Sequence, residues 1–274
     1  MLNFFESILY GFVSGCAEIL PISLEAHQAI MLKLFGINQK LPFCDLLIHI
    51  AILAAVIIGC RGTFLRIRRE SRAYSRSRNR TYRTAGHYEM RLLRTVSVPL
   101  VLGQLFRISA DSLQLNYVWI AIFLLINGLF LFVQEYMPHS NKKASQMTSI
   151  DSVLMGVFSA LSVLPGISRN GVLLSYSITR GADKQSAVNW LLLLSVPALI
   201  VLCIFDVAGI VSLGFGIASF VVFLCYLLAA LLAFAGAYLA ILLLRILAVH
   251  TGFGVFTYYS WGAALFTIVL YLIS

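Results

Sequence analysis

Six stretches of this sequence are apolar over about the 20 residues that a helix needs to cross the hydrocarbon core of a lipid bilayer. They lie at 43–60, 92–109, 115–135, 186–205, 214–245 and 253–273. The chain is 60% hydrophobic and has a mean hydropathy of +0.92, far from the balance of a soluble globular domain. We therefore predict an all-α polytopic membrane protein with six transmembrane helices, in which residues 1–274 form a single integral membrane domain.

Two further apolar stretches, 3–36 and 149–180, are broken in the middle. Pro21 interrupts the first and Pro165-Gly166 interrupts the second, so each leaves two pieces that are too short to cross a bilayer. Broken backbone at membrane depth is tolerated only where it is buried in protein or lines a cavity. The two stretches therefore predict two broken re-entrant helical hairpins, each entering and leaving by one face of the membrane.

The two broken stretches also resemble each other. GFVS at 11–14 aligns with GVFS at 156–159, and at the same offset of 145 residues Ser23 aligns with Ser168. Three predicted spans separate the two hairpins, an odd number, so the second copy must lie upside down relative to the first. This pattern predicts an inverted-topology repeat, with hairpins that meet near the midplane around a shared cavity. The two copies cover about residues 1–135 and 149–273.

The basic residues are concentrated in one segment. The formal net charge is +9, and eleven arginines lie between positions 61 and 94, opposed there only by Glu70 and Glu89. The segment lacks the aromatic pattern of a nucleic-acid site, so we expect no nucleic-acid partner. Under the positive-inside rule, 61–91 is predicted as a basic cytoplasmic loop beside anionic lipid headgroups. Both termini and the opening of the first hairpin then face outward.

The second hairpin reads VLPGISRNG over 163–171. Gly166 and Gly171 allow the backbone to approach a ligand closely, and Ser168 can cap the half-helix that follows. Arg169 adds a fixed cation at the start of that helix. Backbone N–H groups at a helix N-terminus and a guanidinium group both suit phosphate, so the segment predicts an oxyanion site. The alternative is an ordinary Pro-Gly turn with Arg169 at the membrane interface.

The first hairpin adds a carboxylate, an imidazole and a hydroxyl. Glu18 ends the first half, Ser23 is expected to cap the second half, and His27 lies four residues after Ser23 on the same face. Converging opposite Arg169, these groups could bind a divalent cation, Mg²⁺ or Ca²⁺, and transfer protons. Because one carboxylate is too few for a cation cage, substrate oxygens and water would complete the ligand set. The alternative for His27 is a satisfied structural role.

At these residues the sequence resembles the undecaprenyl-diphosphate phosphatase family, also called bacitracin-resistance proteins. The family's first motif is Glu or Gln followed by GxxExLPISSxGH, and its second is PGxSRSG. This sequence matches the first motif at Gly15, Glu18, Leu20, Pro21, Ile22, Ser23 and His27, and the second at Pro165, Gly166, Ser168, Arg169 and Gly171. The resemblance covers essentially the whole chain.

The resemblance implies a multi-pass protein of a bacterial inner membrane, with an active site open to the outside. It implies release of inorganic phosphate from an isoprenoid diphosphate lipid, aided by a divalent cation. His27, Glu18 and Arg169 would be catalytic, with Glu18 also the metal ligand. The phosphate-binding residues would be Ser23, Ser168, Arg169, Gly166, Asn170 and Gly171.

The sequence departs from the motifs at Ser14, Leu24, Glu25, Ala26 and Asn170. Leu24 stands where the family has the second serine of its pair, a nucleophile or phosphate contact. Three outcomes follow: His27 is the nucleophile or general base and the serine is dispensable, Glu25 or Ser23 compensates, or hydrolysis is lost while lipid-phosphate binding is kept.

Phosphatase activity is thus the first functional hypothesis. The second is a non-hydrolytic isoprenoid-phosphate transporter or flippase that uses the same pocket, because inverted repeats are a transporter architecture. The third is an accessory membrane protein that retains only the fold. A homodimer is one arrangement that remains open.

Overall fold

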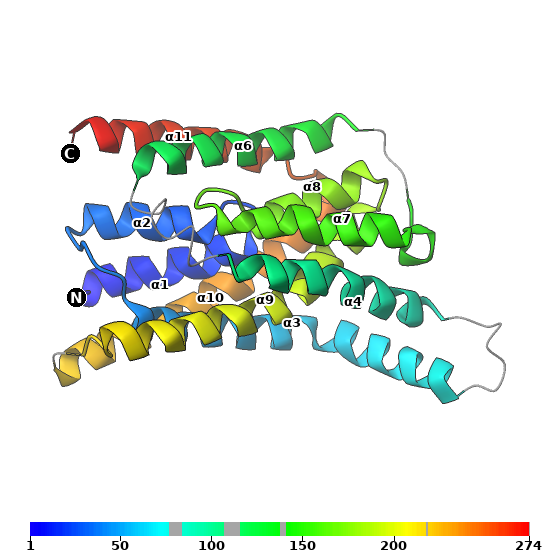
Figure 1. The fold of residues 1–274 in the computed structure, drawn as a ribbon, viewed down its shortest axis with the longest axis horizontal. Helices are drawn as coiled ribbons and strands as arrows, with labels where there is room; N and C mark the ends of the chain where they lie inside the picture. Colours follow the sequence, from blue (N-terminus) through cyan, green and yellow to red (C-terminus); the bar gives the residue numbers. More distant parts are fainter. Residues whose placement is uncertain (77–83, 107–115, 138–140, 218, 274) are drawn as a thin grey trace.

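The computed structural model describes residues 1–76, 84–106, 116–137, 141–217 and 219–273. Within these ranges the chain is helical and contains no β-strand (Figure 1). The first half contains α1 (Phe4–Ile19), α2 (Leu24–Leu34), α3 (Pro42–Arg76), α4 (Ala85–Gln104) and α6 (Tyr117–Glu135). The second contains α7 (Ser149–Ala160), α8 (Arg169–Thr179), α9 (Lys184–Leu213), α10 (Phe220–His250) and α11 (Val255–Ile273), with short 3₁₀ turns η2 (Ala144–Gln146) and η3 (Leu161–Val163).

Five of the described helices are long and apolar enough to cross a membrane, namely α3, α6, α9, α10 and α11. The predicted all-α polytopic membrane fold is confirmed. The remaining predicted span, 92–109, corresponds largely to the second half of α4. The last three residues of this predicted span lie outside the described residues. The first half of α4 carries Glu89, Arg91 and Arg94, so only part of this helix is apolar.

Both broken stretches form hairpins, and the hairpins enter the bundle from opposite ends (Figure 1). The α1/α2 hairpin enters from the end that carries both chain termini. The α7/α8 hairpin enters from the other end and turns through η3. Both turns lie in the middle of the bundle, as the inverted repeat predicts.

The helix pairings follow the same repeat. α1 packs on α10, and its counterpart α7 packs on α4. α3 packs on α10, and its counterpart α9 packs on α4. The two central helices α3 and α9 contact each other, as do α6 and α11. Exchanging the two halves therefore leaves these pairings unchanged.

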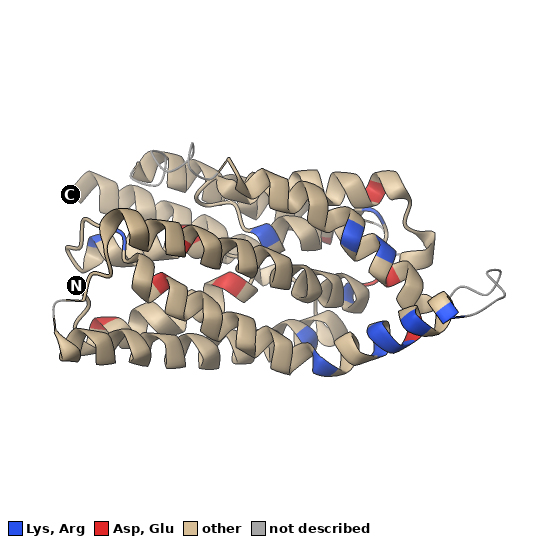
Figure 2. Cartoon of the chain, turned by 60° about the horizontal axis from the view of Figure 1, so that its bottom comes forward, with Lys and Arg blue, Asp and Glu red and all other residues tan. Residues whose placement is uncertain are grey.

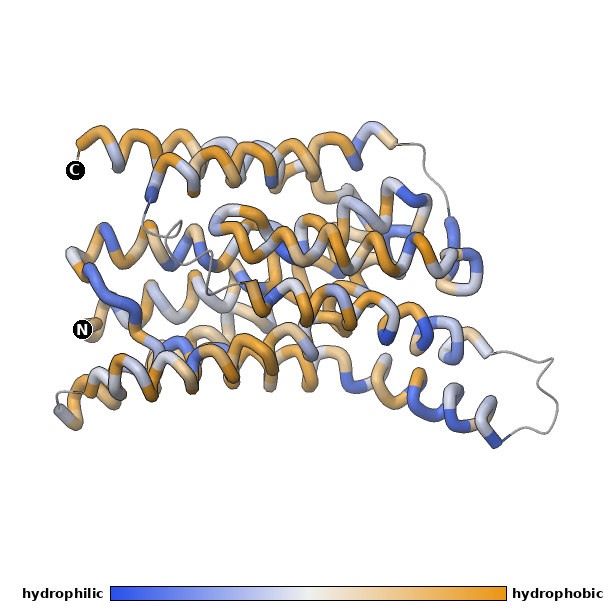
Figure 3. The backbone as a smooth tube through the Cα atoms, viewed as in Figure 1, coloured by the Kyte–Doolittle hydropathy of each residue, from blue (hydrophilic) through white to orange (hydrophobic). Residues whose placement is uncertain are grey.

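The basic segment is not the loop that the sequence predicted. Residues 61–76 continue α3 and residues 85–91 begin α4, so helix covers most of 61–91. Arginine has a high helix propensity and its side chain can remain solvated, so α3 passes from an apolar half to a hydrophilic half without ending (Figure 3). Residues 77–83 of the predicted loop lie outside the described residues.

Charge separates the two ends of the bundle. Lys and Arg residues gather along the second half of α3, at the end opposite the two termini (Figure 2). The loop after α6 and the α8–α9 connection lie at this end too, where Lys143 pairs with Asp183 and Arg180 pairs with Asp151. The clusters that the sequence assigned to one side of a membrane therefore do share one end.

Candidate functional site

The turns of the two hairpins enclose a small cavity of about 40 Å³ in the middle of the bundle. Both helix starts that follow the breaks contribute to its wall, as the inverted repeat predicts. Three other elements, α1, α4 and α9, and the turn η3 complete it. The lining residues are Ala17, Glu18, Ser23, Leu24, Glu25, Gln104, Ser162, Ile167, Ser168, Arg169 and Leu202.

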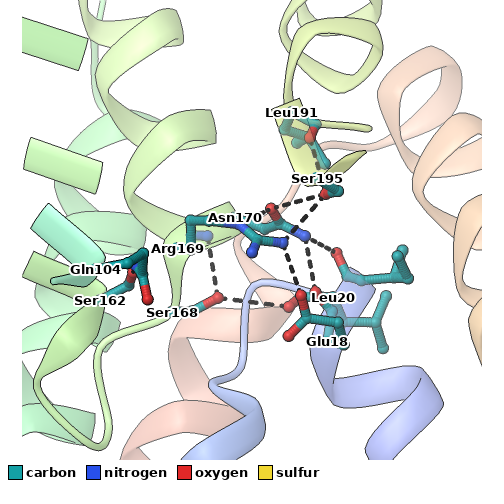
Figure 4. Close-up of polar contacts among 11 residues, drawn as sticks. Glu18, Leu20, Gln104, Ser162, Ser168, Arg169, Asn170, Leu191 and Ser195 are labelled. Carbon is teal, nitrogen blue, oxygen red and sulfur yellow. Dashed lines mark hydrogen bonds and ion pairs between the residues drawn. The ribbon is translucent and has the colours of Figure 1, made fainter. Parts of the chain in front are cut away.

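A buried ion pair joins the two hairpins at this cavity. Arg169 Nη2 donates to Glu18 Oε1 at 2.7 Å, and each side chain is only 8% exposed. The same nitrogen donates to Ser195 Oγ of α9 at 3.2 Å. An arginine at membrane depth is costly without a partner, and Glu18 is that partner. The predicted convergence of Glu18 and Arg169 across the repeat is thus present (Figure 4).

The start of α8, predicted as an oxyanion site, is a capped helix N-terminus that borders the cavity. Ser168 Oγ accepts from Gly171 N at 3.1 Å, so Ser168 caps α8 as predicted. Gly166 has a φ of +120°, which a residue with a side chain rarely adopts, and an added Cβ would lie 2.7 Å from Ile120 O of α6. Gly171 is packed against Asn127, where an added Cβ would lie 2.9 Å from Oδ1. Neither glycine lines the cavity, so both shape the turn rather than contact the cavity directly.

Ser23 does not cap α2, which corrects the prediction. Its side chain makes no capping hydrogen bond. Instead Ser23 Oγ accepts from Gly166 N of the other hairpin at 3.1 Å. Its φ of +68° lies in the left-handed region, which costs a non-glycine residue about 1–2 kcal/mol. The backbone at Ser23 thus turns the hydroxyl away from its own helix and toward the opposite hairpin.

Asn170, predicted to bind phosphate, contacts the end of α1 in the structure. Its side chain is absent from the cavity wall. Its Nδ2 donates to the carbonyl oxygens of Glu18 and Ile19 at 2.8 and 3.0 Å. These carbonyls end α1, where helix carbonyls have no partner within the helix. Asn170 therefore fixes the end of α1 against α8 and holds Glu18 beside Arg169.

His27 lies away from the Glu18–Arg169 pair. It projects toward α11, where Nε2 hydrogen-bonds Tyr259 OH at 2.7 Å and the two rings stack. Nδ1 hydrogen-bonds Ser23 O at 2.7 Å. Both ring nitrogens are engaged, and His27 does not line the cavity. The structure brings His27 next to the backbone of Ser23 and not next to Arg169.

Several polar residues of the site had no signal in the motifs. Gln104 of α4 donates to Ser162 Oγ of η3 at 3.3 Å, and both residues line the cavity (Figure 4). Leu24 and Glu25, which the sequence analysis named as departures within the first motif, also line the cavity. A lone polar residue in an apolar stretch is the only sequence sign that could have found Gln104 and Ser195, and it is weak.

The donors around the cavity fit a cation only in part. Among the described residues no group of three or more His, Cys, Asp or Glu side chains is arranged to hold a metal ion. Glu18 and Glu25 both line the cavity, which gives two carboxylates. Mg²⁺ and Ca²⁺ take six or more oxygen ligands. The site therefore fits such a cation if substrate oxygens and water supply the rest.

The fold and the site define a class, a polytopic membrane protein in which an inverted repeat places an Arg–Glu pair on a cavity between two re-entrant hairpins. The chain belongs to the bacitracin resistance protein BacA family, whose model matches residues 7–266. Undecaprenyl-diphosphatase 1 from Shouchella clausii is 30% identical over 73% of this chain and 72% of its own length. Undecaprenyl-diphosphatase from Alkaliphilus metalliredigens is 26% identical over 98% and 99%, and the Treponema denticola undecaprenyl-diphosphatase is 30% identical over 79% and 80%.

Proposed function

We propose that this protein is an undecaprenyl-diphosphatase, a hydrolase that converts the lipid diphosphate to the monophosphate and phosphate and so returns a lipid carrier to cell-wall synthesis. The observation that carries the proposal is the Arg169 guanidinium beside the capped start of α8, on a cavity between both hairpins. Membership of the BacA family and similarity to undecaprenyl-diphosphatases support it. No observation favours transport without hydrolysis over this activity.

Substrate binding requires the Glu18–Arg169 pair to open. The cavity has a volume of only about 40 Å³, and a diphosphate is far larger. A phosphate carries more charge than a carboxylate and accepts a bidentate contact from guanidinium. In our proposal Arg169 moves from Glu18 to the substrate, and Glu18 is released to face the reacting phosphate.

Ser168, Arg169 and the backbone N–H groups at the start of α8 then stabilise the charge that develops on the transferred phosphate. Such electrostatic stabilisation is the larger share of catalysis in phosphoryl transfer. Ser23 lines the cavity and is the proposed phosphate contact or nucleophile from the first hairpin. His27, predicted as catalytic, contacts the Ser23 carbonyl, so its proposed role is to act through the position of Ser23. Gly166, Asn170 and Gly171 position this machinery.

We also propose a divalent cation that Glu18 and Glu25 share with the substrate. When bound, the cation would neutralise phosphate charge. As a ligand of the cation, Glu25 would contribute a polar group to the site next to Leu24, whose side chain has none. Activity should fall on chelation and return with Mg²⁺ or Ca²⁺, and Glu25→Gln should raise the cation concentration needed for half-maximal activity. Activity that is indifferent to both changes contradicts the cation proposal.

The proposed location is a bacterial inner membrane, with the cavity reached from the end that carries both termini. Support comes from the basic residues at the opposite end, which the positive-inside rule places in the cytoplasm. The homodimer stays a prediction, which light scattering on detergent-purified protein would decide by giving the protein mass of the particle.

The experiment that tests the function is phosphate release from undecaprenyl diphosphate by purified protein. Arg169→Ala should abolish release, because no other cation lines the cavity within the described residues. Ser23→Ala should lower it by at least about a hundredfold, as losses of single transition-state contacts do. Arg94→Ala, an exposed arginine on α4, is the matched control and should keep wild-type activity. Phosphate release by the Arg169→Ala variant at the wild-type rate would contradict the proposal.

A further inference from the structure

One face of α1 carries polar residues from the cavity to the end of the bundle that holds the termini. Tyr10, Ser14 and Glu18 recur every four residues, so they lie one above another on the helix. All three side chains are buried, at 1%, 0% and 8% exposure. In a helix that contacted only lipid or apolar neighbours, these buried polar side chains would be unfavourable because they would lack hydrogen-bond partners.

Helices α2 and α3 complete a hydrogen-bonded group around that row. Gln28 Nε2 donates to Asp45 Oδ1 at 3.1 Å and lies 3.5 Å from Ser14 Oγ. Tyr10 OH donates to the same Asp45 oxygen at 2.8 Å. Three helices thus share one acidic group at a level between the cavity and the terminal end.

A buried His–Asp pair lies one helical turn farther along α3. His49 Nδ1 and Asp206 Oδ2 are 2.6 Å apart, and their side chains are 3% and 15% exposed. Asp206 follows Leu202 of the cavity wall by one turn of α9, on the same face. We call Tyr10, Ser14, Gln28, Asp45, His49 and Asp206 the outward polar column.

His49 is the member of the outward polar column whose second ring nitrogen has no hydrogen-bond partner among the described residues. Its Nε2 is buried, and no described residue lies within hydrogen-bonding distance of it. A purely structural histidine at membrane depth would be expected to use both nitrogens, because a buried unsatisfied polar group costs about 1–3 kcal/mol. His49 is therefore bonded to Asp206 through Nδ1, while its buried Nε2 has no partner among the described residues.

The charge of the outward polar column limits what could travel along it. Its ionisable members besides His49 are Asp45, Asp206 and Tyr10, so it repels phosphate and the lipid headgroup. A proton can pass between the ionisable side chains of the column, and ionisable residues within membrane spans are typical of proton pathways.

We propose that the outward polar column is the outlet for the proton that hydrolysis releases, with His49 Nε2 as the first acceptor. The inference rests on the proposed function. In the net reaction the P–O bond between the terminal phosphorus and the bridging oxygen breaks, and the lipid monophosphate leaves with the electron pair. The oxygen and one proton of a water molecule stay on the released phosphate. One water proton must leave at neutral pH. It reaches His49 through water, Asp206 stabilises the imidazolium, and the proton leaves at the terminal end.

Among the described residues, few charged side chains lie near His49. Glu18 and Tyr10 face this region from α1, Asp206 from α9 and Asp45 from α3 itself. From α10, Arg245 hydrogen-bonds Gly59 and Cys60 of α3, which lie more than two turns from His49. Arg169 on α8 is already paired with Glu18.

The first test is the pH dependence of phosphate release. His49→Gln keeps the side-chain volume but cannot accept a proton. It should lower kcat by about a hundredfold or more with KM unchanged, as loss of a proton-transfer group does. Its kcat should keep rising with pH where the wild-type value has levelled, because hydroxide replaces His49 as the acceptor. His250→Gln, an exposed histidine at the opposite end, is the matched control and should match wild type.

The second test is chemical rescue. Imidazole in the buffer should restore much of the activity of His49→Ala, which leaves room for the small base, and little of the activity of His49→Gln, which does not. A structural role predicts no rescue of either variant. A His49→Gln enzyme with wild-type kcat and pH profile, or an inactive His49→Ala enzyme without rescue, overturns the outlet alone. Absence of phosphate release by wild type overturns the proposed function and the outlet together.

Discussion

Asn127 joins the two hairpins although it belongs to neither. Its Oδ1 accepts from Ser168 N at 2.9 Å, and its Nδ2 donates to Pro21 O at 3.0 Å and to Ser260 Oγ at 3.1 Å. Both breaks leave backbone groups that water would otherwise satisfy. At membrane depth these groups need a protein partner, and one amide that donates and accepts serves both breaks.

We therefore predict that Asn127→Ala lowers the free energy of unfolding by about 2–4 kcal/mol, because it leaves buried groups of both hairpins unsatisfied. Denaturation in mixed detergent micelles measures the loss. Leu129→Ala, on the exposed side of the same helix at 53% exposure, is the control and should cost far less. Equal losses for the two variants would show that Asn127 contributes packing alone.

The motif residues were predictable and their supporting residues were not. Glu18 and Arg169 could be expected to meet, because two interrupted stretches in an inverted repeat bring their turns together. The positive φ of Ser23 could not be read from a serine, since nothing local requires it. Ser195 and Asn127 were missed because a single polar residue in an apolar helix produces no periodic pattern.

At the scale of elements, small residues bring α1 close to α10. A Cβ added to Gly11 would overlap the backbone of Ala229, and one added to Gly15 would overlap the backbone of Ala233. Close helix contacts through small residues are the usual way that helices associate in membranes. Because Gly15 precedes Glu18 by less than one turn, the α1–α10 contact also sets the position of the Glu18 carboxylate.

Gly15→Ala should accordingly displace α1, reduce phosphate release and lower the free energy of unfolding by about 1–3 kcal/mol, as overpacking does. Activity and detergent unfolding are measured on the same sample. Gly62→Ala in α3 is the matched control, since an added Cβ there meets no atom within 4 Å. It should be neutral or stabilising by up to about 1 kcal/mol. A Gly15→Ala enzyme that equals the control would show that α1 has room to move.

A helix boundary could be predicted from the sequence only where a residue interrupts the helix by its own covalent structure. Both hairpins could be predicted because proline interrupts a helix for covalent reasons. The end of α3 could not, because the arginine-rich composition of 61–76 is equally compatible with a solvated loop and with a solvated helix.

At the scale of the whole molecule, the two repeats are alike in helix pairing and unlike at the cavity. The first hairpin supplies Glu18 and Glu25, whereas the second supplies Arg169 and the capped helix start. Two identical hairpins would place like charges together, which a buried site cannot accommodate. The chemistry of the cavity therefore depends on the divergence of the two copies, while its position depends on their symmetry.

Orientation is the prediction that concerns the whole molecule. The end with the arginines of α3 should be cytoplasmic and the end with Asn38 should face outward. In a cysteine-free background, Asn38→Cys should react with a membrane-impermeant maleimide in intact spheroplasts, because position 38 is exposed at the terminal end. Ser75→Cys, exposed at the basic end, should react only after the membrane is permeabilised. The opposite labelling would direct the outward polar column to the cytoplasm, so that the released proton would enter the cell instead of leaving it.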